Sequence, residues 1–349
     1  MDARLTDEQR MLHQVAAQIA ADLAAEPITE PGPGVWTAHD DRAWASLAET
    51  GLIGLHTPAE LGGGGVGVVE TALAAERLAA VLSPVPFLAA AAWSPALLAA
   101  ARADDALQAV NRGALRLAPV LRRDLSALAQ LDQGGIAFDA RGAQAGLLTD
   151  ADGRLHAVAL GPPTRGADLT RTLRPVAPRA AAIGLAMPLG SPLTAADLIR
   201  VQATALAVLS ADLLGVMQRA LDDAVSYVAR REQFGVPVGS FQAVQHLAAH
   251  AAVLTEGSRS AIWYAAWAAT QLPPDEALLA ARQAKAYCSE AALQVTETSI
   301  QMLGGIALTR EHPSHLRLRR VLLSRKALGD ETAQYAAIAH QRLAPTGTG

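Results

Sequence analysis

The stretch RREQFGVPVGSFQAVQHLAAH, residues 230–250, decides how the fold is read. It places two glycines and a proline between two long segments in which apolar residues recur at helical spacing. Arg231, Gln233 and Phe234 stand just before this break, where a side chain can reach across an interface or toward a ligand. The stretch is therefore either a plain helix–helix connection or a turn that contacts a ligand. The sequence outside it is needed to choose between these two interpretations.

The segments on both sides of this turn predict long helices. Thr194 and Asp197 have the spacing of a helix cap, and the apolar pattern that follows continues until Gly235. Further helices are expected at about residues 241–272 and 275–303, with shorter ones at about 313–324 and 330–343. Long antiparallel helices with short connections are typical of a four-helix bundle, which we assign to a domain of residues 193–349.

The first third of the chain, residues 1–112, also reads as a helical domain. Thr6 and Gln9 form a capping-box pattern ahead of an apolar-periodic segment. The glycine run at 62–65 is not followed by the Lys–Ser/Thr pair of a phosphate-binding loop, so we predict a flexible lead-in to the next helix.

Residues 113–192 differ from both flanks and predict a short β domain. They are rich in Gly, Pro and Arg and contain the alternating stretches GGIAFDA, AGLLTD, LHAVAL and DLTRTLRPVA. The predicted fold class is therefore mainly α with a small β domain between two helical domains.

The composition indicates a globular protein of the reducing cytoplasm. Of 349 residues 51% are hydrophobic and 18% charged, and the net charge of −4 gives no sign of nucleic-acid binding. The single cysteine, Cys288, excludes an intrachain disulfide and a cysteine metal cluster, and its apolar surroundings predict a buried side chain. The N-terminus is too charged for a signal peptide. The most apolar run, residues 85–101, is interrupted by prolines, so we expect buried helix rather than a membrane span.

A second motif, QMLGGIALTREHPSHLRLRR at 301–320, closes the third long helix. Together the two motifs resemble the paired signatures of the acyl-CoA dehydrogenase family, in the same order and each at a helix end. The resemblance implies an N-terminal helical domain, a middle β domain and a C-terminal four-helix bundle. It also implies FAD-dependent desaturation of an acyl-CoA thioester, in which a carboxylate removes the α proton and the β hydrogen leaves as hydride to the flavin. Electrons usually pass on to an electron-transferring flavoprotein.

The same resemblance assigns roles to the two turns. In the family, the Arg of the first turn reaches the pyrophosphate of the FAD bound mainly by the neighbouring subunit, and Arg231 matches it. Phe234 matches the aromatic residue beside it and is assigned to the same cofactor site. The Gln and glycines of the second turn contact that same FAD, and Gln301, Gly304 and Gly305 match there. A guanidinium suits a pyrophosphate because it carries both charge and directed donors. The alternative for both turns is ordinary helix capping.

The catalytic position departs from the family pattern. Where the family carries its usual glutamate this chain has Leu328, and where some members carry the base on the first long helix it has Ala205. The only nearby carboxylates, Asp330 and Glu331, are displaced by two and three residues, and Asp330 also suits the N-cap of the last helix. The stretch that holds the flavin ring in catalytic members has no match in the short β domain.

This combination resembles the non-catalytic subunits of actinobacterial heteromeric acyl-CoA dehydrogenases, α2β2 assemblies that act on steroid side-chain CoA thioesters. The sequence is compatible with three functions. The chain is a subunit that completes the FAD site of a catalytic partner, or a self-sufficient enzyme with Asp330 or Glu331 as its base, or a scaffold that kept the fold and lost the chemistry.

Three further groups of residues receive structural predictions. His312 and His315 have helix-like spacing but no third ligand, so no metal site is predicted. Arg317, Arg319 and Arg320 are expected to form a charged face that is solvated or lies between subunits. Trp263 and Trp267 are expected to pack in the bundle.

Overall fold

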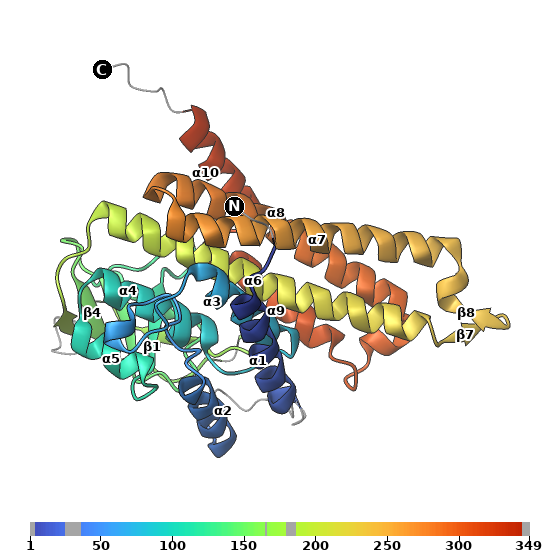
Figure 1. Cartoon of the computed structure of the whole chain (residues 1–349), viewed down its shortest axis with the longest axis horizontal. Coiled ribbons are helices and arrows are strands. Elements are labelled where there is room, and N and C mark those ends of the chain that lie inside the picture. Colours follow the sequence, from blue (N-terminus) through green and yellow to red (C-terminus); the bar gives the residue numbers. More distant parts are fainter. Residues whose placement is uncertain (1–3, 25–35, 165, 179–185, 344–349) are drawn as a thin grey trace.

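A computed structural model describes residues 4–24, 36–164, 166–178 and 186–343. Helices at both ends of the chain enclose a small sheet, and the long C-terminal helices project to one side (Figure 1). The mainly α fold class with a small β unit is confirmed. The division into three domains at residues 112 and 192 stays a prediction.

The N-terminal helices bury a continuous apolar core against the bundle. The predicted capping box is confirmed, because the backbone N–H of Gln9 donates to Thr6 Oγ1 and that of Thr6 to Gln9 Oε1. The apolar run at 85–101 is buried, as expected, but it begins as a π-helix. The elements are α1 (Asp7–Ala24), α2 (Ala38–Glu49), η1 (Ala59–Leu61), α3 (Val68–Ala80), η2 (Phe87–Trp93), α4 (Ser94–Ala100) and α5 (Asp104–Asn111).

The glycine run before α3 leads into that helix as predicted, but it is not a loose lead-in. All four backbone N–H groups of residues 62–65 donate to nearby carbonyls. A Cβ at Gly63 would come 2.2 Å from Thr57 Oγ1, and one at Gly64 would come 2.6 Å from the Leu55 carbonyl. The glycines are needed because this loop folds closely on itself.

The β unit is one sheet of six strands in the order β5–β2–β1–β3–β4–β6, antiparallel except for the β1–β3 pair. The four alternating stretches supply β2, β3, β4 and β5. The central strand β1 was not predicted, because Pro119 within it argues against a strand. The strands are β1 (Leu117–Leu121), β2 (Gly135–Ala137), β3 (Ala145–Thr149), β4 (Leu155–Val158), β5 (Arg174–Val176) and β6 (Ala186–Leu189).

The C-terminal helices form the predicted bundle. Thr194 and Asp197 cap the first of them reciprocally, and Cys288 is fully buried, both as expected. Trp263 packs against the core, as predicted for bundle packing. The helices are α6 (Ala195–Val228), α7 (Gln242–Gln271), α8 (Pro274–Leu303), η5 (Gly304–Leu308), α9 (Ser314–Lys326) and α10 (Glu331–Leu343).

The end of α6 differs from the prediction. The helix stops at Val228, and the chain forms a small hairpin of β7 (Glu232–Gln233) and β8 (Val236–Pro237) before the short helix η4 (Val238–Ser240). The hairpin turns at Phe234 and Gly235, whose φ angles are 57° and 80°. Two successive residues with positive φ make the tight turn that suits a hairpin.

In the described part of the chain, α6 is the one helix long and apolar enough to span a membrane. Of its most apolar window 83% is buried inside the protein. The apolar surface of α6 is therefore explained by its central place in the bundle.

Candidate functional site

The two motif turns lie at the same end of the bundle, far from the sheet (Figure 1). Ala224 and Val228 at the end of α6 share a small apolar cluster with Met302, Leu303 and Ala307 of the second turn. The cluster fixes the two turns relative to each other. The structure thus brings together the two regions that the sequence assigned to one cofactor.

The first turn presents Arg231 and Phe234 outward. The Phe234 side chain is 93% exposed and held only by an edge contact with the Phe241 ring, 6.4 Å between centroids. The backbone of Arg231 is fixed, since its N–H donates to Tyr227 O and its carbonyl accepts from Val238 N. Its guanidinium makes no ion pair or hydrogen bond with any residue in the described ranges. A fixed backbone with an unengaged charged tip can meet an external anion.

The second turn is equally open. Gln301, Gly304 and Gly305 are all exposed, and a Cβ at either glycine would meet nothing within 4 Å. The glycines are therefore not required by packing within this chain. Gly304 adopts a φ of 66°, which favours glycine at the end of α8.

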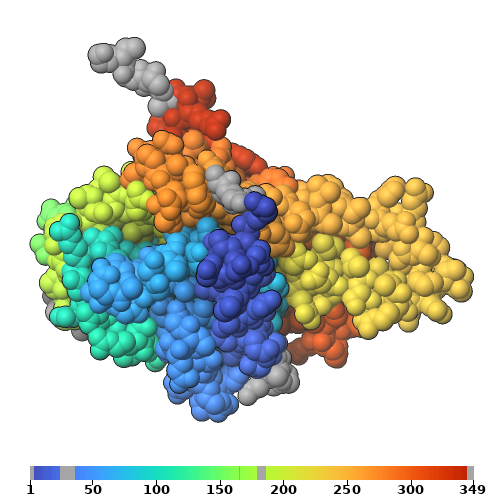
Figure 2. All heavy atoms as spheres, viewed as in Figure 1, coloured from blue at the N-terminus to red at the C-terminus, as the bar shows by residue number. Residues whose placement is uncertain are grey.

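The segment that follows Glu232 is free of formally charged side chains over a long stretch. From Gln233 to Thr255 the chain contains no Lys, Arg, Asp or Glu. This segment protrudes from the body of the protein (Figure 2). Its exposed apolar side chains are Phe234, Val236, Phe241, Leu247 and Val253. Depletion of charge around exposed aromatic and aliphatic side chains is typical of the centre of a protein–protein interface.

Leu328, the residue that the sequence places at the family's base position, lies in a turn fastened by hydrogen bonds. Leu328 is buried with a φ of 59°, and its N–H donates to the carbonyl of Leu125, in the loop after β1, at 2.7 Å. The buried ammonium of Lys285 donates to the carbonyls of Arg325 and Gly329 at 2.7 and 3.0 Å. The turn that carries Leu328 is thereby fastened both to the β unit and to α8.

The two displaced carboxylates are engaged elsewhere. Asp330 pairs with Lys326 and accepts from Ala333 N at 3.1 Å, so it caps α10 as predicted. Glu331 pairs with Arg325 through both oxygens. These hydrogen bonds lower the pKa of both carboxyl groups. A general base is more effective with a pKa near neutrality, so neither carboxylate is tuned for proton abstraction.

The cavities beside these positions lack a carboxylate. A cavity of about 230 Å³ borders Leu328, with Trp93, Leu97 and Val201 among its walls. The space beside Ala205 is only about 10 Å³, room for roughly one water molecule. Among the described residues, no Asp or Glu lines either cavity.

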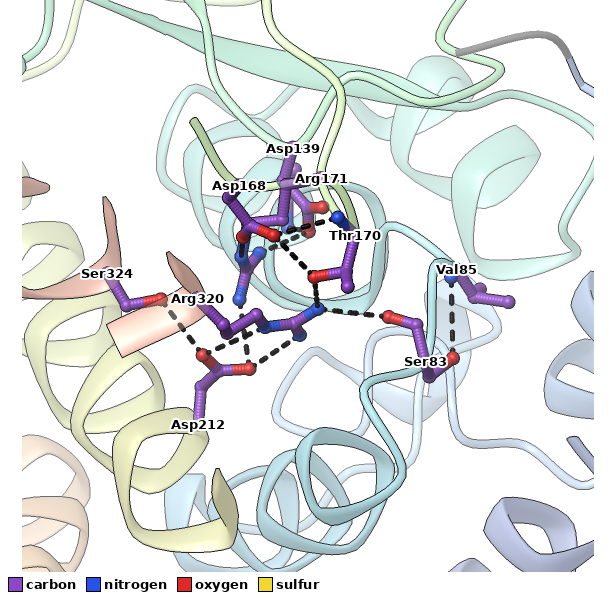
Figure 3. A network of polar contacts seen from close by, with 10 residues as sticks. Ser83, Val85, Asp139, Asp168, Thr170, Arg171, Asp212, Arg320 and Ser324 are labelled. Atoms are coloured by element: carbon purple, nitrogen blue, oxygen red, sulfur yellow. Dashed lines mark hydrogen bonds and ion pairs between the residues drawn. The ribbon is translucent and has the colours of Figure 1, made fainter. Parts of the chain in front are cut away.

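The arginines of α9 correct a prediction. Only Arg319 is exposed, whereas Arg317 and Arg320 are each 4% exposed and face inward. Arg317 pairs with Asp223 of α6 at 2.5 Å. Arg320 pairs with Asp212 of α6 at 2.7 Å (Figure 3). They face inward because α6 offers carboxylates opposite them, Asp212 buried and Asp223 half-buried.

Asp212 and Arg320 belong to a buried ionic cluster between the β unit and the bundle (Figure 3). Arg171 contacts Asp212 at 2.9 Å and Asp139 at 3.0 Å, and Ser324 donates to Asp212 at 3.0 Å. Burial opposes ionisation of Asp212, but Arg171 and Arg320 outweigh it and lower the pKa of Asp212 to about 2. Burial raises the pKa of Asp139. The cluster ties the loops of the β unit to α6 and α9.

His312 of the predicted histidine pair contacts a neighbouring hydroxyl. Nδ1 of His312 lies 2.6 Å from the Ser314 hydroxyl. In the ranges that the structure describes, no three His, Cys, Asp or Glu side chains gather to hold a metal ion.

Comparison with known proteins identifies the class. The N-terminal domain model of acyl-CoA dehydrogenases matches residues 6–104, and the C-terminal domain model matches residues 204–343. The acyl-CoA dehydrogenase IpdE2 of Mycobacterium tuberculosis is 32% identical over 316 residues, 90% of this chain and 91% of that protein. Its namesake in Mycolicibacterium smegmatis is 29% identical over 95% of this chain and 97% of that protein.

Two solved structures have the same fold as this chain. A Tcur3481–Tcur3483 steroid ACAD variant superposes with a TM-score of 0.81 at 27% identity, over 96% of this chain and 98% of that one. The ChsE4–ChsE5 complex of Mycobacterium tuberculosis shares the fold, with a TM-score of 0.79 at 23% identity over 98% of this chain and 99% of that one. The chain belongs to the acyl-CoA dehydrogenase family, oxidoreductases that act on acyl-CoA with FAD.

Proposed function

We propose that this chain is the non-catalytic subunit of a heteromeric, cytoplasmic acyl-CoA dehydrogenase and completes the FAD site of a catalytic partner. The bond between Leu328 N and Leu125 O carries the proposal. The likeness to Tcur3481–Tcur3483 and to the ChsE4–ChsE5 complex supports an unlike partner, and the former supports a steroid CoA thioester as substrate. Electrons from the partner's flavin pass to an electron-transferring flavoprotein.

The chemistry explains why that bond matters. Desaturation removes a proton from Cα and a hydride from Cβ, so the substrate must lie between a base and the flavin. In this chain the turn at the base position and the loop after β1 hydrogen-bond directly to each other. A cavity of about 230 Å³ borders Leu328, but among the described residues that line it there is no Asp or Glu, and Leu328 could not accept the proton. The residues present therefore do not fit a catalytic flavin site within this chain.

The opposite end of the bundle does fit a cofactor held by another subunit. Arg231 can donate to a pyrophosphate, and Phe234 can cover an apolar part of the same molecule. Gln301 supplies amide donors and an acceptor, and the open surface at Gly304 and Gly305 lets a backbone or ligand approach closely. When bound, FAD would accept the hydride in the partner. The uncharged surface around Phe241 and Leu247 supports contact with that partner.

Arg231→Ala tests this proposal most directly. In the complex with the partner, the variant is expected to bind FAD very roughly 10- to 100-fold more weakly, because it loses a charged hydrogen bond to phosphate. The dissociation constant can be measured by fluorescence titration of the apo complex with FAD. Arg230→Ala is the matched control, since that side chain donates to Ser226 near the end of α6. Equal FAD affinity for both variants would remove Arg231 from the cofactor site.

A second test concerns the base. Asp330→Asn and Glu331→Gln, each made in this chain, are expected to leave turnover of the complex within about twofold, whereas loss of a true base slows a reaction by about 10²–10⁴-fold. Leu328→Glu is expected to create no activity in the isolated chain. Initial rates with an artificial electron acceptor provide the measurement. A loss of several hundred-fold in either substitution, with folding and FAD content intact, would make this chain catalytic.

A further inference from the structure

A second large cavity lies away from Leu328 and away from the two motif turns. Its volume is about 310 Å³, and it forms where the loop before α3, helix α4, the start of α6 and the end of α7 meet. It shares only Val201 with the cavity beside Leu328. Its apolar walls include Val66, Val68, Ala99 and Ala269.

Hydrogen bonds between elements hold these walls in place. Val68 N–H donates to Thr270 Oγ1 at 3.1 Å, which joins α3 to α7. Thr57 Oγ1 donates to Gly54 O at 2.7 Å, and Asn111 of α5 donates to Thr57 Oγ1 at 3.1 Å. With the closely folded glycine run, these bonds make the loop a rigid wall. A preformed cavity binds a ligand without first having to order its own walls.

The ionisable residues that line the cavity are Arg200, Asp197 and His56. Among the described residues that line it, Arg200 alone carries a permanent positive charge. Two of its N–H groups are held by the carbonyls of Ala269 and Leu272 at 2.9 and 3.3 Å, which leaves three of the five guanidinium donors for a ligand. Asp197 also lines the cavity, held at the start of α6 by the N–H and hydroxyl of Thr194, and burial lowers the pKa of His56 to about 4, so that imidazole is neutral.

We propose that this cavity binds a small apolar carboxylic acid, with its hydrocarbon body against Val66, Val68 and Ala99 and its carboxylate on Arg200. A free acid fits better than its CoA thioester. The thioester has no carboxylate at that end, and the phosphates of CoA need more cations than the single arginine of this rim. The site is separate from the partner's FAD site, so it serves to sense or retain an acid rather than to desaturate a thioester.

Calorimetric titration of the full chain with decanoate and with cholate tests the site, the first probe having an alkyl body and the second fused rings. At least one is expected to bind saturably at one site per chain. Arg200→Gln is expected to weaken that binding by at least about tenfold, as loss of a charge-assisted hydrogen bond to a carboxylate should. Decan-1-ol, which lacks the carboxylate, is expected to bind the wild type and Arg200→Gln equally.

Two further variants complete the design. Val66→Trp fills the cavity from its exposed rim and is expected to abolish binding with little effect on folding. Arg112→Gln, which changes an exposed arginine just after α5 and outside the cavity, is expected to bind like the wild type. Failure of both acids to bind, or equal binding by the wild type, Arg200→Gln and Val66→Trp, would overturn the proposal. Because no flavin is involved, the result is independent of the role of Arg231.

Discussion

Asp212→Asn is expected to lower the free energy of unfolding by about 3–5 kcal/mol, the usual effect of removing one partner from a buried ionic cluster. The carboxylate contacts two guanidinium groups, Arg171 at 2.9 Å and Arg320 at 2.7 Å. Asparagine keeps the size of the side chain but leaves both cations buried with less compensating charge. Urea denaturation of the full chain, followed by circular dichroism, measures the change.

Two matched variants show whether the loss of stability comes from the ionic cluster or from any removal of a carboxylate on α6. Asp222→Asn removes an exposed carboxylate nearly three turns further along that helix and is expected to change the free energy of unfolding by no more than about 0.5 kcal/mol. Ser324→Ala removes one hydroxyl donor to Asp212 and is expected to lose about 1 kcal/mol. If Asp212→Asn lost no more than Asp222→Asn, the cluster would not stabilise the junction.

The same cluster predicts a dependence on acid. The folded-state pKa of Asp212, about 2, lies below its ordinary value of 3.8. A carboxylate with a lowered pKa stabilises the fold fully above its unfolded value, so this contribution is present above about pH 4 and is lost as the pH falls toward 2. Asp212→Asn should therefore lose less stability than the wild type between pH 4 and pH 2.

Local signals in the sequence predicted local structure well. The caps at Thr6 and Thr194 were predictable because both hydrogen-bond partners lie within three residues. The bundle followed from apolar periodicity sustained over long segments. The hairpin at Phe234 was missed, because a positive φ at a phenylalanine has no local sequence signal.

The buried cluster was missed for a different reason. Arg320 and Asp212 are 108 positions apart, so no local pattern joins them. One signal was available, since Asp212 is a lone charge within the apolar run LAVLSADLLGVM and had to find a partner inside the protein. Likewise the sequence predicted that Leu328 stands where the family carries its glutamate, but only the structure shows that the N–H of Leu328 donates to Leu125 O.

The prediction about FAD content has the largest expected effect, because the isolated chain should contain almost no FAD and the complex should contain it. Purified alone, this chain is expected to be colourless, with less than about 0.1 FAD per chain. Co-purified with its catalytic partner, it is expected to give about one FAD per pair of unlike subunits. A preformed ligand site needs a cavity that covers most of the ligand. Here the turn at Leu328 and the loop at Leu125 are joined, and Lys285 holds the same turn from behind.

The ratio of flavin absorbance near 450 nm to protein concentration measures the FAD content of the isolated chain and of the complex. The complex should keep its FAD on gel filtration, and mixing the separated subunits with free FAD should restore the colour. Arg231→Ala in this chain should lower the FAD retained by the complex without changing the colourless state of the isolated chain. That contrast is informative because Leu328 and Arg231 lie at different places in the fold. A stoichiometric flavin spectrum from the isolated chain would mean that the contact between Leu328 and Leu125 opens to admit a cofactor, and that this chain holds a flavin of its own.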